Sequence, residues 1–290
     1  MKRIGIIGAG IMAAGMVQNF LKHGYEVTMW NRSPGKLKVL ISAGAKQADS
    51  PKSVSSVSDI IIECVSDDEA SRGVWLGEQG ILAGADKNKV LIASSSLSLN
   101  WTDELAKMCS DKAYKFLDMP LTGSRAGAEN GTLRLLIGGD KTTLESVRSD
   151  LETISEKIYY FGPAGAGMRF KLVLNALIGI HMNAISQARR LAEMAGIDPS
   201  EFGHAIIDGT MGPASPSTRL VIDSAAWPEN HINFAVELLE KDLRYAQEMA
   251  KDFGFEFDLL NETQADYKKA KDSGLGKSDI TSISRIFESI

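Results

Sequence analysis

The first 33 residues constrain the fold most, because they predict a strand, a glycine turn, a helix and a second strand in direct succession. Residues 3–7 are an apolar run typical of a buried parallel strand, residues 11–23 predict a helix that ends at Gly24, and residues 25–30 predict the next strand. The glycines in residues 8–13 let the backbone approach a pyrophosphate, whose charge then lies at the helix N-terminus. This pattern is typical of dinucleotide binding. The predicted contacts in the turn are Gly8, Gly10, Ile11 and Met12.

The end of the second strand indicates which dinucleotide is bound. An NAD-binding unit usually has Asp or Glu about 20 residues after the glycine turn, where the carboxylate holds the ribose hydroxyls. This chain has Asn31, Arg32 and Ser33 at that place and no acid. A guanidinium suits a 2′-phosphate because it presents a planar fork of donors and a fixed positive charge. We therefore expect NADP(H), although Asn-Arg-Ser is also common in turns.

A second interpretation of the N-terminus is a secretory signal peptide. Two basic residues near Met1 are followed by the uncharged stretch 4–17, and Ala13-Ala14 resembles a cleavage region. Ala13 also stands where a third glycine often occurs, although the dinucleotide fingerprint tolerates Ala there. The apolar stretch continues into a helix, a glycine stop and a second strand, and this continuation favours the dinucleotide-binding unit.

The overall composition is that of an ordinary globular protein. Of 290 residues, 44% are hydrophobic and 24% are charged, and the formal net charge is -5. No run of five Lys or Arg occurs, so we expect no nucleic-acid partner. No apolar stretch reaches about 18 residues, so we expect no membrane span. Cys64 and Cys109 are too few for a disulfide framework or a zinc site, and we expect no metal and a cytoplasmic location.

Strand and helix patterns alternate through the first half of the chain, which predicts a parallel sheet covered on both faces. Further strands are predicted at residues 59–65, 90–93, 115–118, 132–137 and 158–161. Helices are predicted between them at residues 67–74, 100–109 and 141–155. The fold class is therefore α/β, with an N-terminal Rossmann doubly wound parallel sheet.

The strand pattern stops at the glycine-rich segment 162–167, where we place the domain boundary. Residues 1–162 would form the NADP-binding domain, and residues 163–290 an all-α C-terminal domain. The second domain would begin with a long interdomain helix over residues 168–195, which ends at Gly196. Its other helices are predicted at residues 199–207, 234–253 and 259–273.

Ligands of such sheets bind beyond the carboxyl ends of the strands, where three segments of this chain fall. Two are the polar segments at residues 65–68 and 94–96. The third, residues 118–133, is rich in small residues whose backbone N–H groups could hold a carboxylate, and Arg125 could add a bidentate clamp. A flexible glycine loop before a hairpin is the structural alternative for this segment.

The helix that follows the boundary carries Lys171 and Asn175, whose spacing of four places both on one face. The surrounding residues are apolar, and a buried lysine is expected to have a lowered pKa, which suits a general acid near neutral pH. Asn175 could orient the ammonium or the substrate oxygen. A lysine whose ammonium extends to the surface is the alternative.

The four histidines lack the spacing of metal ligands.

These motifs, in this order, resemble the β-hydroxyacid dehydrogenase family, which includes 3-hydroxyisobutyrate dehydrogenases and semialdehyde reductases. The resemblance covers nearly the whole chain and rests on Gly8-Ala-Gly-Ile-Met-Ala13, on residues 118–133, on Gly165-Ala-Gly-Met-Arg-Phe-Lys-Leu-Val-Leu-Asn175 and on Lys241-Asp242-Leu243. Gly274-Leu-Gly-Lys-Ser-Asp279 resembles the C-terminal glycine and aspartate segment of the family. Segment 123–131 is closest to the glyoxylate/succinic semialdehyde reductase branch.

The resemblance implies a function for each matching residue. Lys171 would donate a proton to the carbonyl oxygen as hydride arrives from the nicotinamide, and Asn175 would assist. Thr122, Gly123 and Ser124 would bind the substrate carboxylate, beside Arg125. The other implied cofactor contacts are Val65, Ser66, Ser96 and Lys241. The resemblance also implies a homodimer or homotetramer that pairs through the helical domain.

Some positions depart from the family pattern, and other functions compete. Thr122 replaces the usual Ser, and Ala176 replaces a frequent second Asn. Ala93 replaces the usual acid before the serine pair, and Asp258 replaces a common Pro.

The main expectation is NADPH-dependent reduction of a small aldehyde acid such as glyoxylate, succinic semialdehyde, tartronate semialdehyde or methylmalonate semialdehyde. Imine reduction on the same architecture and a non-catalytic NADP-binding scaffold are the alternatives.

Overall fold

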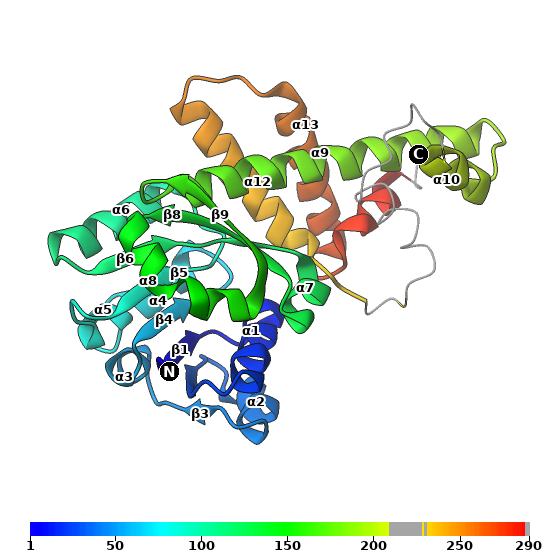
Figure 1. The fold of residues 1–290 in the computed structure, drawn as a ribbon. Coiled ribbons are helices and arrows are strands. Elements are labelled where there is room, and N and C mark those ends of the chain that lie inside the picture. The colour runs from blue at the N-terminus through cyan, green and yellow to red at the C-terminus, as the bar shows by residue number, and fades with distance from the viewer. Residues whose placement is uncertain (209–227, 229–230, 288–290) are drawn as a thin grey trace. The chain divides into compact units, whose positions relative to one another are not determined.

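The computed structural model describes residues 1–208, 228 and 231–287, coloured along the chain in Figure 1. The chain divides into two compact units, Met1–Lys171 and Leu172–Ile290. They are called unit 1 and unit 2 below, and each is described by itself.

Unit 1 is built on a nine-stranded sheet with the order β3-β2-β1-β4-β5-β6-β8-β7, in which β9 also pairs with β8. The strands from β3 to β6 are parallel to their neighbours, whereas β8 runs antiparallel to β6 and β7. The strands are β1 (Ile4–Ile7), β2 (Val27–Trp30), β3 (Lys46–Gln47), β4 (Ile60–Glu63), β5 (Val90–Ala93), β6 (Lys115–Asp118), β7 (Leu121–Thr122), β8 (Leu133–Gly139) and β9 (Ser155–Gly162). The predicted doubly wound sheet is confirmed.

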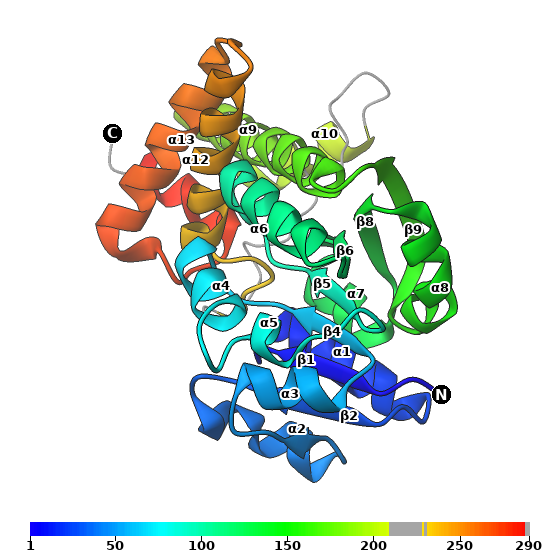
Figure 2. The same ribbon diagram turned by 90° about the vertical axis from the view of Figure 1, so that its left-hand side faces the viewer.

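The helices of unit 1 cover both faces of this sheet (Figure 2). Side chains of α1 and α8 share one apolar cluster with Ile6 and Ile62, and side chains of α3, α4 and α6 share another with Ile61. The helical segments are α1 (Ile11–Lys22), η1 (Pro34–Leu37), α2 (Lys38–Ser42), α3 (Pro51–Val57), α4 (Asp68–Trp75), α5 (Ile81–Gly84), α6 (Leu99–Asp111), α7 (Ser124–Asn130), α8 (Lys141–Leu151) and η2 (Glu152–Ile154). Because alternate strand residues face opposite sides, the buried parallel strands are apolar throughout.

Unit 2 is helical in the part that the structure describes, apart from an isolated bridge between Ala235 and Asp279. Its long helix α9 begins at Ala166, within unit 1. Gly179 allows close packing of α9, since a Cβ there would lie 2.9 Å from Leu243 of α12. The helical segments are α9 (Ala166–Met194), α10 (Pro199–Asp208), α12 (Val236–Asp252), α13 (Asp258–Ala270), η4 (Lys271–Leu275) and η5 (Ile280–Phe287). None of the helices described here is long and apolar enough to span a membrane.

Candidate cofactor and active site

The predicted cofactor residues follow adjacent parallel strands. Ile7, the last residue of β1, pairs with Trp30 of β2 and with Glu63 of β4, and Glu63 pairs with Ala93 of β5. All four strands therefore end at the same level, at the sheet edge where such folds bind ligands. Residues 8–12, 31–33, 64–66 and 94–96 leave the sheet from this edge.

The glycine turn after β1 has the backbone geometry that a dinucleotide phosphate requires. Gly8 has φ +114°, and a Cβ there would lie 2.0 Å from the carbonyl oxygen of Cys64. A Cβ at Gly10 would meet no atom within 4 Å, so the space beside it is open. Gly10 begins α1 without a side-chain cap, and the first turn of the helix carries no acid. These observations fit a pyrophosphate at the N-terminus of α1.

The helix α1 is held against α7, the helix within the predicted substrate segment. A Cβ at Gly15 would lie 2.5 Å from the backbone of Ala128, so only glycine permits this approach. The Nδ2 of Asn19 donates hydrogen bonds to the carbonyl oxygens of Ala128 (2.8 Å) and Gly15 (2.9 Å). The glycine turn and the predicted substrate segment are thus joined through their helices.

The segment after β2 presents an exposed cation. Asn31 Nδ2 donates a hydrogen bond to the carbonyl oxygen of Ser33 (2.9 Å), which closes a short turn. Arg32 is exposed and pairs with no carboxylate among the residues that the structure describes. Its contact with a 2′-phosphate stays a prediction.

The ends of β4 and β5, here called the β4–β5 edge (residues 63–66 and 93–96), are joined by hydrogen bonds. The backbone N–H of Val65 donates to Ser95 Oγ (2.7 Å), and the Ser95 hydroxyl donates to Glu63 Oε1 (2.7 Å). Glu63 is fully buried, and burial raises the pKa of its carboxyl to about 7. The sequence interpretation missed Glu63. An acid at the end of an otherwise apolar strand was the available signal.

A second buried carboxyl, Asp118, anchors the start of α9. Asp118 accepts hydrogen bonds from the backbone N–H groups of Gly165 (2.6 Å) and Met168 (2.8 Å), and burial raises the pKa of its carboxyl. A Cβ at Gly138 would lie 2.4 Å from Asp118 Oδ1, and one at Gly167 would lie 2.2 Å from the carbonyl oxygen of Leu136. We call these residues the β6–α9 joint. It fixes the first turn of the helix that carries Lys171.

The predicted substrate segment forms β7 and α7 rather than an irregular loop. Gly123 and Ser124 both have positive φ, +128° and +57°, so the backbone turns sharply between the two elements. The Arg125 guanidinium lies 3.7 Å from the Glu129 carboxylate, one helical turn further on. Carboxylate binding by Thr122, Gly123, Ser124 and Arg125 stays a prediction.

Both predicted catalytic residues lie on α9, and both are buried, with Lys171 8% and Asn175 1% exposed. Asn175 Nδ2 donates to Asp242 Oδ2 (2.5 Å), and the ammonium of Lys241 lies 3.0 Å from Asp242 Oδ1. Asn175 Oδ1 is buried and accepts no hydrogen bond from any described residue. The sequence interpretation assigned no function to Asp242, which links Asn175 to Lys241 within unit 2.

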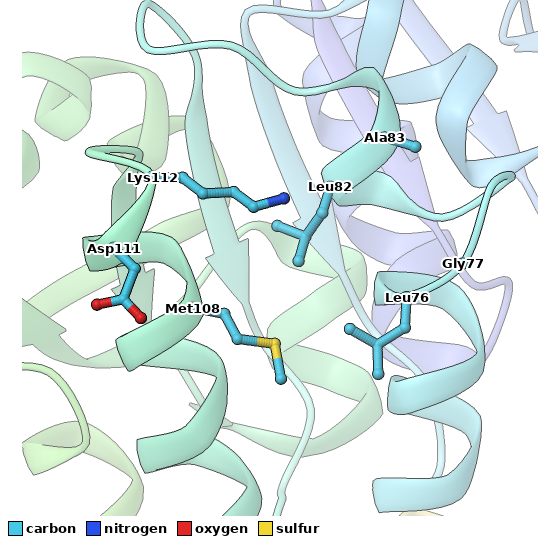
Figure 3. Close-up of a pocket in the computed structure, with 7 residues that line it drawn as sticks. All are labelled: Leu76, Gly77, Leu82, Ala83, Met108, Asp111 and Lys112. Carbon is cyan, nitrogen blue, oxygen red and sulfur yellow. The ribbon is translucent and has the colours of Figure 1, made fainter.

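One further cavity of unit 1 contains none of the predicted site residues. It has a volume of about 360 Å³ and is shown in Figure 3. Leu76 lies at the end of α4, and Met108 and Asp111 lie at the end of α6. Helices of a parallel sheet return toward the amino ends of the strands, so this cavity lies at the edge opposite the glycine turn. The lining residues are Leu76, Gly77, Leu82, Ala83, Met108, Asp111 and Lys112.

Family descriptions match both parts of the chain. Residues 3–162 match the NAD binding domain of 6-phosphogluconate dehydrogenase, and residues 165–287 match the NAD-binding region of NADP-dependent 3-hydroxyisobutyrate dehydrogenase. With the glycine turn at the sheet edge, these matches define the class as an NAD(P)-dependent oxidoreductase that acts on hydroxyl groups. The chain belongs to the β-hydroxyacid dehydrogenase family.

Individual relatives agree with this family. Glyoxylate/succinic semialdehyde reductase 2 of Arabidopsis thaliana, named as chloroplastic, is 29% identical over 97% of this chain and 78% of its own length. The cytokine-like nuclear factor N-PAC of Danio rerio is 28% identical over 99% of this chain, which spans only 62% of that relative. Because these names place relatives in different compartments, the cytoplasmic location stays a prediction.

A solved structure with the same fold is that of Mycobacterium tuberculosis 3-hydroxyisobutyrate dehydrogenase with L-serine. It is 25% identical, the match covers 99% of both chains, and the TM-score is 0.84. The whole described chain therefore has the family's architecture. The predicted division into residues 1–162 and 163–290 is close to the two family matches, and as a domain boundary it stays a prediction.

Proposed function

We propose that this protein reduces small aldehyde acids to hydroxy acids with NADPH. The observation that carries the proposal is Lys171, a buried lysine on α9 one helical turn before the buried Asn175. The β6–α9 joint fixes the backbone of this part of α9. A lysine held in this way suits a general acid, because its proton can be kept at a defined point beside a carbonyl oxygen.

The proposed reaction requires one hydride and one proton. NADPH, when bound, supplies the hydride to the carbonyl carbon and becomes NADP⁺. Lys171 Nζ gives its proton to the carbonyl oxygen, which becomes the hydroxyl of the product. Asn175 assists, since Asp242 fixes its amide nitrogen and leaves Oδ1 as a buried acceptor.

The proposed substrate class is small acids with an aldehyde group: glyoxylate, succinic semialdehyde, tartronate semialdehyde or methylmalonate semialdehyde. The substrate carboxylate would bind at Thr122, Gly123 and Ser124, where the backbone turns into α7 without a side-chain cap. Arg125 would add positive charge on the same helix. The name of the Arabidopsis relative supports this class.

The proposed cofactor contacts lie along the carboxyl edge of the sheet. Arg32 supports NADPH over NADH, because its guanidinium is exposed and unpaired with any described carboxylate. Val65, Ser66 and Ser96 would contact the cofactor from the β4–β5 edge. Lys241 is a further proposed cofactor contact.

A homodimer or homotetramer is proposed as the assembly. Several apolar side chains of α9 are exposed in the single chain, and exposed apolar patches are typical of association surfaces. They are Val173 (55%), Leu177 (49%), Leu191 (69%) and Met194 (66%). The molar mass in solution, measured by light scattering, tests this proposal.

The test of the function is a panel of short aldehyde acids assayed with NADPH and NADH in parallel. We expect turnover with NADPH, and we expect Lys171→Ala to lower kcat by roughly 10²- to 10⁴-fold, the usual contribution of a positioned acid. Lys157→Ala is the matched control, because Lys157 is an exposed lysine of β9 and should leave kcat unchanged. Full kcat in Lys171→Ala would overturn the assigned proton donor.

The same panel separates the two alternative functions. Turnover of cyclic imines without turnover of aldehyde acids would identify an imine reductase. NADPH binding without turnover of either class would identify a cofactor-binding scaffold.

A further inference from the structure

The β4–β5 edge contains a carboxyl group that the proposed reaction does not use. Glu63 ends β4, is fully buried, and lies between Ile7 of β1 and Ala93 of β5 in the strand register. Side chains at paired positions lie on the same face of a sheet, so the small Ala93 leaves room for the Glu63 side chain. A buried acid without a cation costs stability. Its presence at this position therefore calls for an explanation beyond packing.

The direction of the hydrogen bonds at this edge follows from their donors. The N–H of Val65 can only donate, so Ser95 Oγ accepts it, at 2.7 Å. The hydroxyl hydrogen of Ser95 is then free to point at Glu63 Oε1, also at 2.7 Å. Glu63 is the terminal acceptor of this chain of bonds, and the side chains of Ser71 and Trp75 also face its carboxyl. The Glu63 carboxyl fixes the rotation of the Ser95 hydroxyl. This rotation in turn determines which lone pair of Ser95 Oγ accepts the hydrogen bond from the N–H of Val65.

Both ends of this chain of bonds adjoin residues proposed to contact the cofactor. Val65 is itself one of them and precedes Ser66, while Ser95 precedes Ser96. The bonds tie the backbone after β4 to the backbone after β5 where both leave the sheet.

We propose that Glu63, acting through the Ser95 hydroxyl, is a positioning residue that holds Val65, Ser66 and Ser96 in the geometry that binds the nicotinamide dinucleotide. This inference rests on the proposed function, because it requires that the β4–β5 edge contacts the cofactor. Glu63 touches neither cofactor nor substrate in this scheme.

The test measures NADPH binding directly, by titration of the intrinsic fluorescence of the enzyme. Ser95→Ala and Glu63→Leu are each expected to raise the Kd for NADPH roughly tenfold, the effect of losing one buried hydrogen bond that orders a binding segment. Glu63→Gln is expected to bind within about twofold of the wild type, because the amide oxygen still accepts from Ser95. Ser94→Ala is the matched control: Ser94 is an equally buried neighbour, but its hydroxyl donates to the carbonyl oxygen of Met119.

Two further measurements separate positioning from a purely structural contribution. The double variant Glu63→Leu with Ser95→Ala should bind no more weakly than Ser95→Ala alone, because the two residues act in series. Glu63→Leu leaves the buried Ser95 hydroxyl without its acceptor, so its urea unfolding is measured in parallel and a lower stability than that of the wild type is expected. The expected signature is weaker cofactor binding in Ser95→Ala and Glu63→Leu under conditions where both variants are folded, together with binding that is retained in Glu63→Gln.

The outcomes distinguish this inference from the proposed function. A wild-type protein that binds neither NADPH nor NADH overturns the proposed function. If the wild type binds NADPH and Ser95→Ala binds it equally well, the positioning inference is overturned and the proposed function is not. Additive losses in the double variant, or a tenfold loss in Glu63→Gln, also overturn it, and if Glu63→Leu fails to fold, Ser95→Ala decides.

Discussion

The two ends of strand β4 carry acids in opposite electrostatic states. Asp59 precedes the strand at the surface, 2.7 Å from the Arg3 guanidinium, and the hydrogen bond from Arg3 lowers the pKa of its carboxyl to about 2. Glu63 ends the strand in the interior, where its hydrogen-bond donors are neutral and include the Ser95 hydroxyl, and burial raises the pKa of its carboxyl to about 7. The comparison shows that a cation at the surface stabilises the charged form, whereas burial beside a neutral donor destabilises it.

The largest effect is expected at Asp118, which adds a third arrangement to this comparison: a buried carboxyl with two backbone N–H donors. Asp118→Ala leaves the N–H groups of Gly165 and Met168 buried without an acceptor, at about 1–3 kcal/mol each. We expect the free energy of unfolding to fall by roughly 4 kcal/mol, and kcat to fall because the start of α9 loses its anchor. Urea unfolding and steady-state kinetics measure these effects.

Asp118→Asn is the control for this prediction. Its amide oxygen can still accept one of the two N–H groups, so the loss of stability should be about half as large. Equal losses in both variants would show that the negative charge, rather than the number of acceptors, anchors α9.

Glu63→Gln tests the buried end of β4 through the pH dependence of stability. The pKa of Glu63 is raised on folding, from 4.5 to about 7, so its contribution is fully present below pH 4.5 and is lost as the pH rises to about 7. The wild type should lose about 3 kcal/mol over this window, a component that Glu63→Gln lacks. Tryptophan fluorescence during urea unfolding at pH 5 and pH 8 measures it, since Trp75 and Trp101 are buried on the same side of the sheet. Parallel pH profiles for the two proteins would contradict the prediction.

Arg32→Ser tests whether an exposed charge at the sheet edge has a functional effect that the Arg3–Asp59 pair lacks. Without the guanidinium, the Kd for NADPH should rise roughly 10- to 100-fold, the cost of one charge-assisted contact, while the Kd for NADH stays unchanged. Lys36→Ser, an exposed cation in η1, serves as the control. A variant with an unaltered ratio of the two Kd values would remove Arg32 from the cofactor site.

The smallest effect is expected at the exposed end of β4. The pKa of Asp59 is lowered from 3.8 to about 2 on folding, so its contribution is present above pH 3.8 and is lost as the pH falls toward 2. The Asp59 side chain is 37% exposed, and solvent screening limits the pair to less than about 1 kcal/mol. Asp59→Asn should therefore change stability slightly at pH 7. A loss as large as that of Asp118→Ala would contradict the distinction between the two ends of the strand.

The alternation of strands and helices was predictable because it depends on local patterns. The apolar runs at residues 3–7, 59–65 and 90–93 correspond to β1, β4 and β5, and the breaker segment at residues 162–167 precedes the helical half. Strands β3 and β7 were missed. Each has two residues, and both residues of β3 are exposed and polar, so no hydrophobic pattern indicates them.

The candidate site was predictable only where its residues are close in sequence. The glycine turn and the pair Lys171 and Asn175 follow from spacing within one helix or turn. Glu63 and Ser95 are 32 residues apart, and Asn175 and Asp242 are 67 apart. Such pairs depend on strand order and helix packing, which composition and periodicity do not specify.

The contact between Gly15 and Ala128 also limits how this protein can vary. A side chain at position 15 would overlap the backbone of α7, whereas Gly35 and Gly73 face open space. A saturation library should therefore tolerate small residues at positions 35 and 73 and reject almost every replacement at position 15. The helices α1 and α7 meet at this contact, so neither helix can shift without the other. If residues 122–125 bind the substrate as we propose, its preference should change through the exchange of side chains, without movement of these two helices.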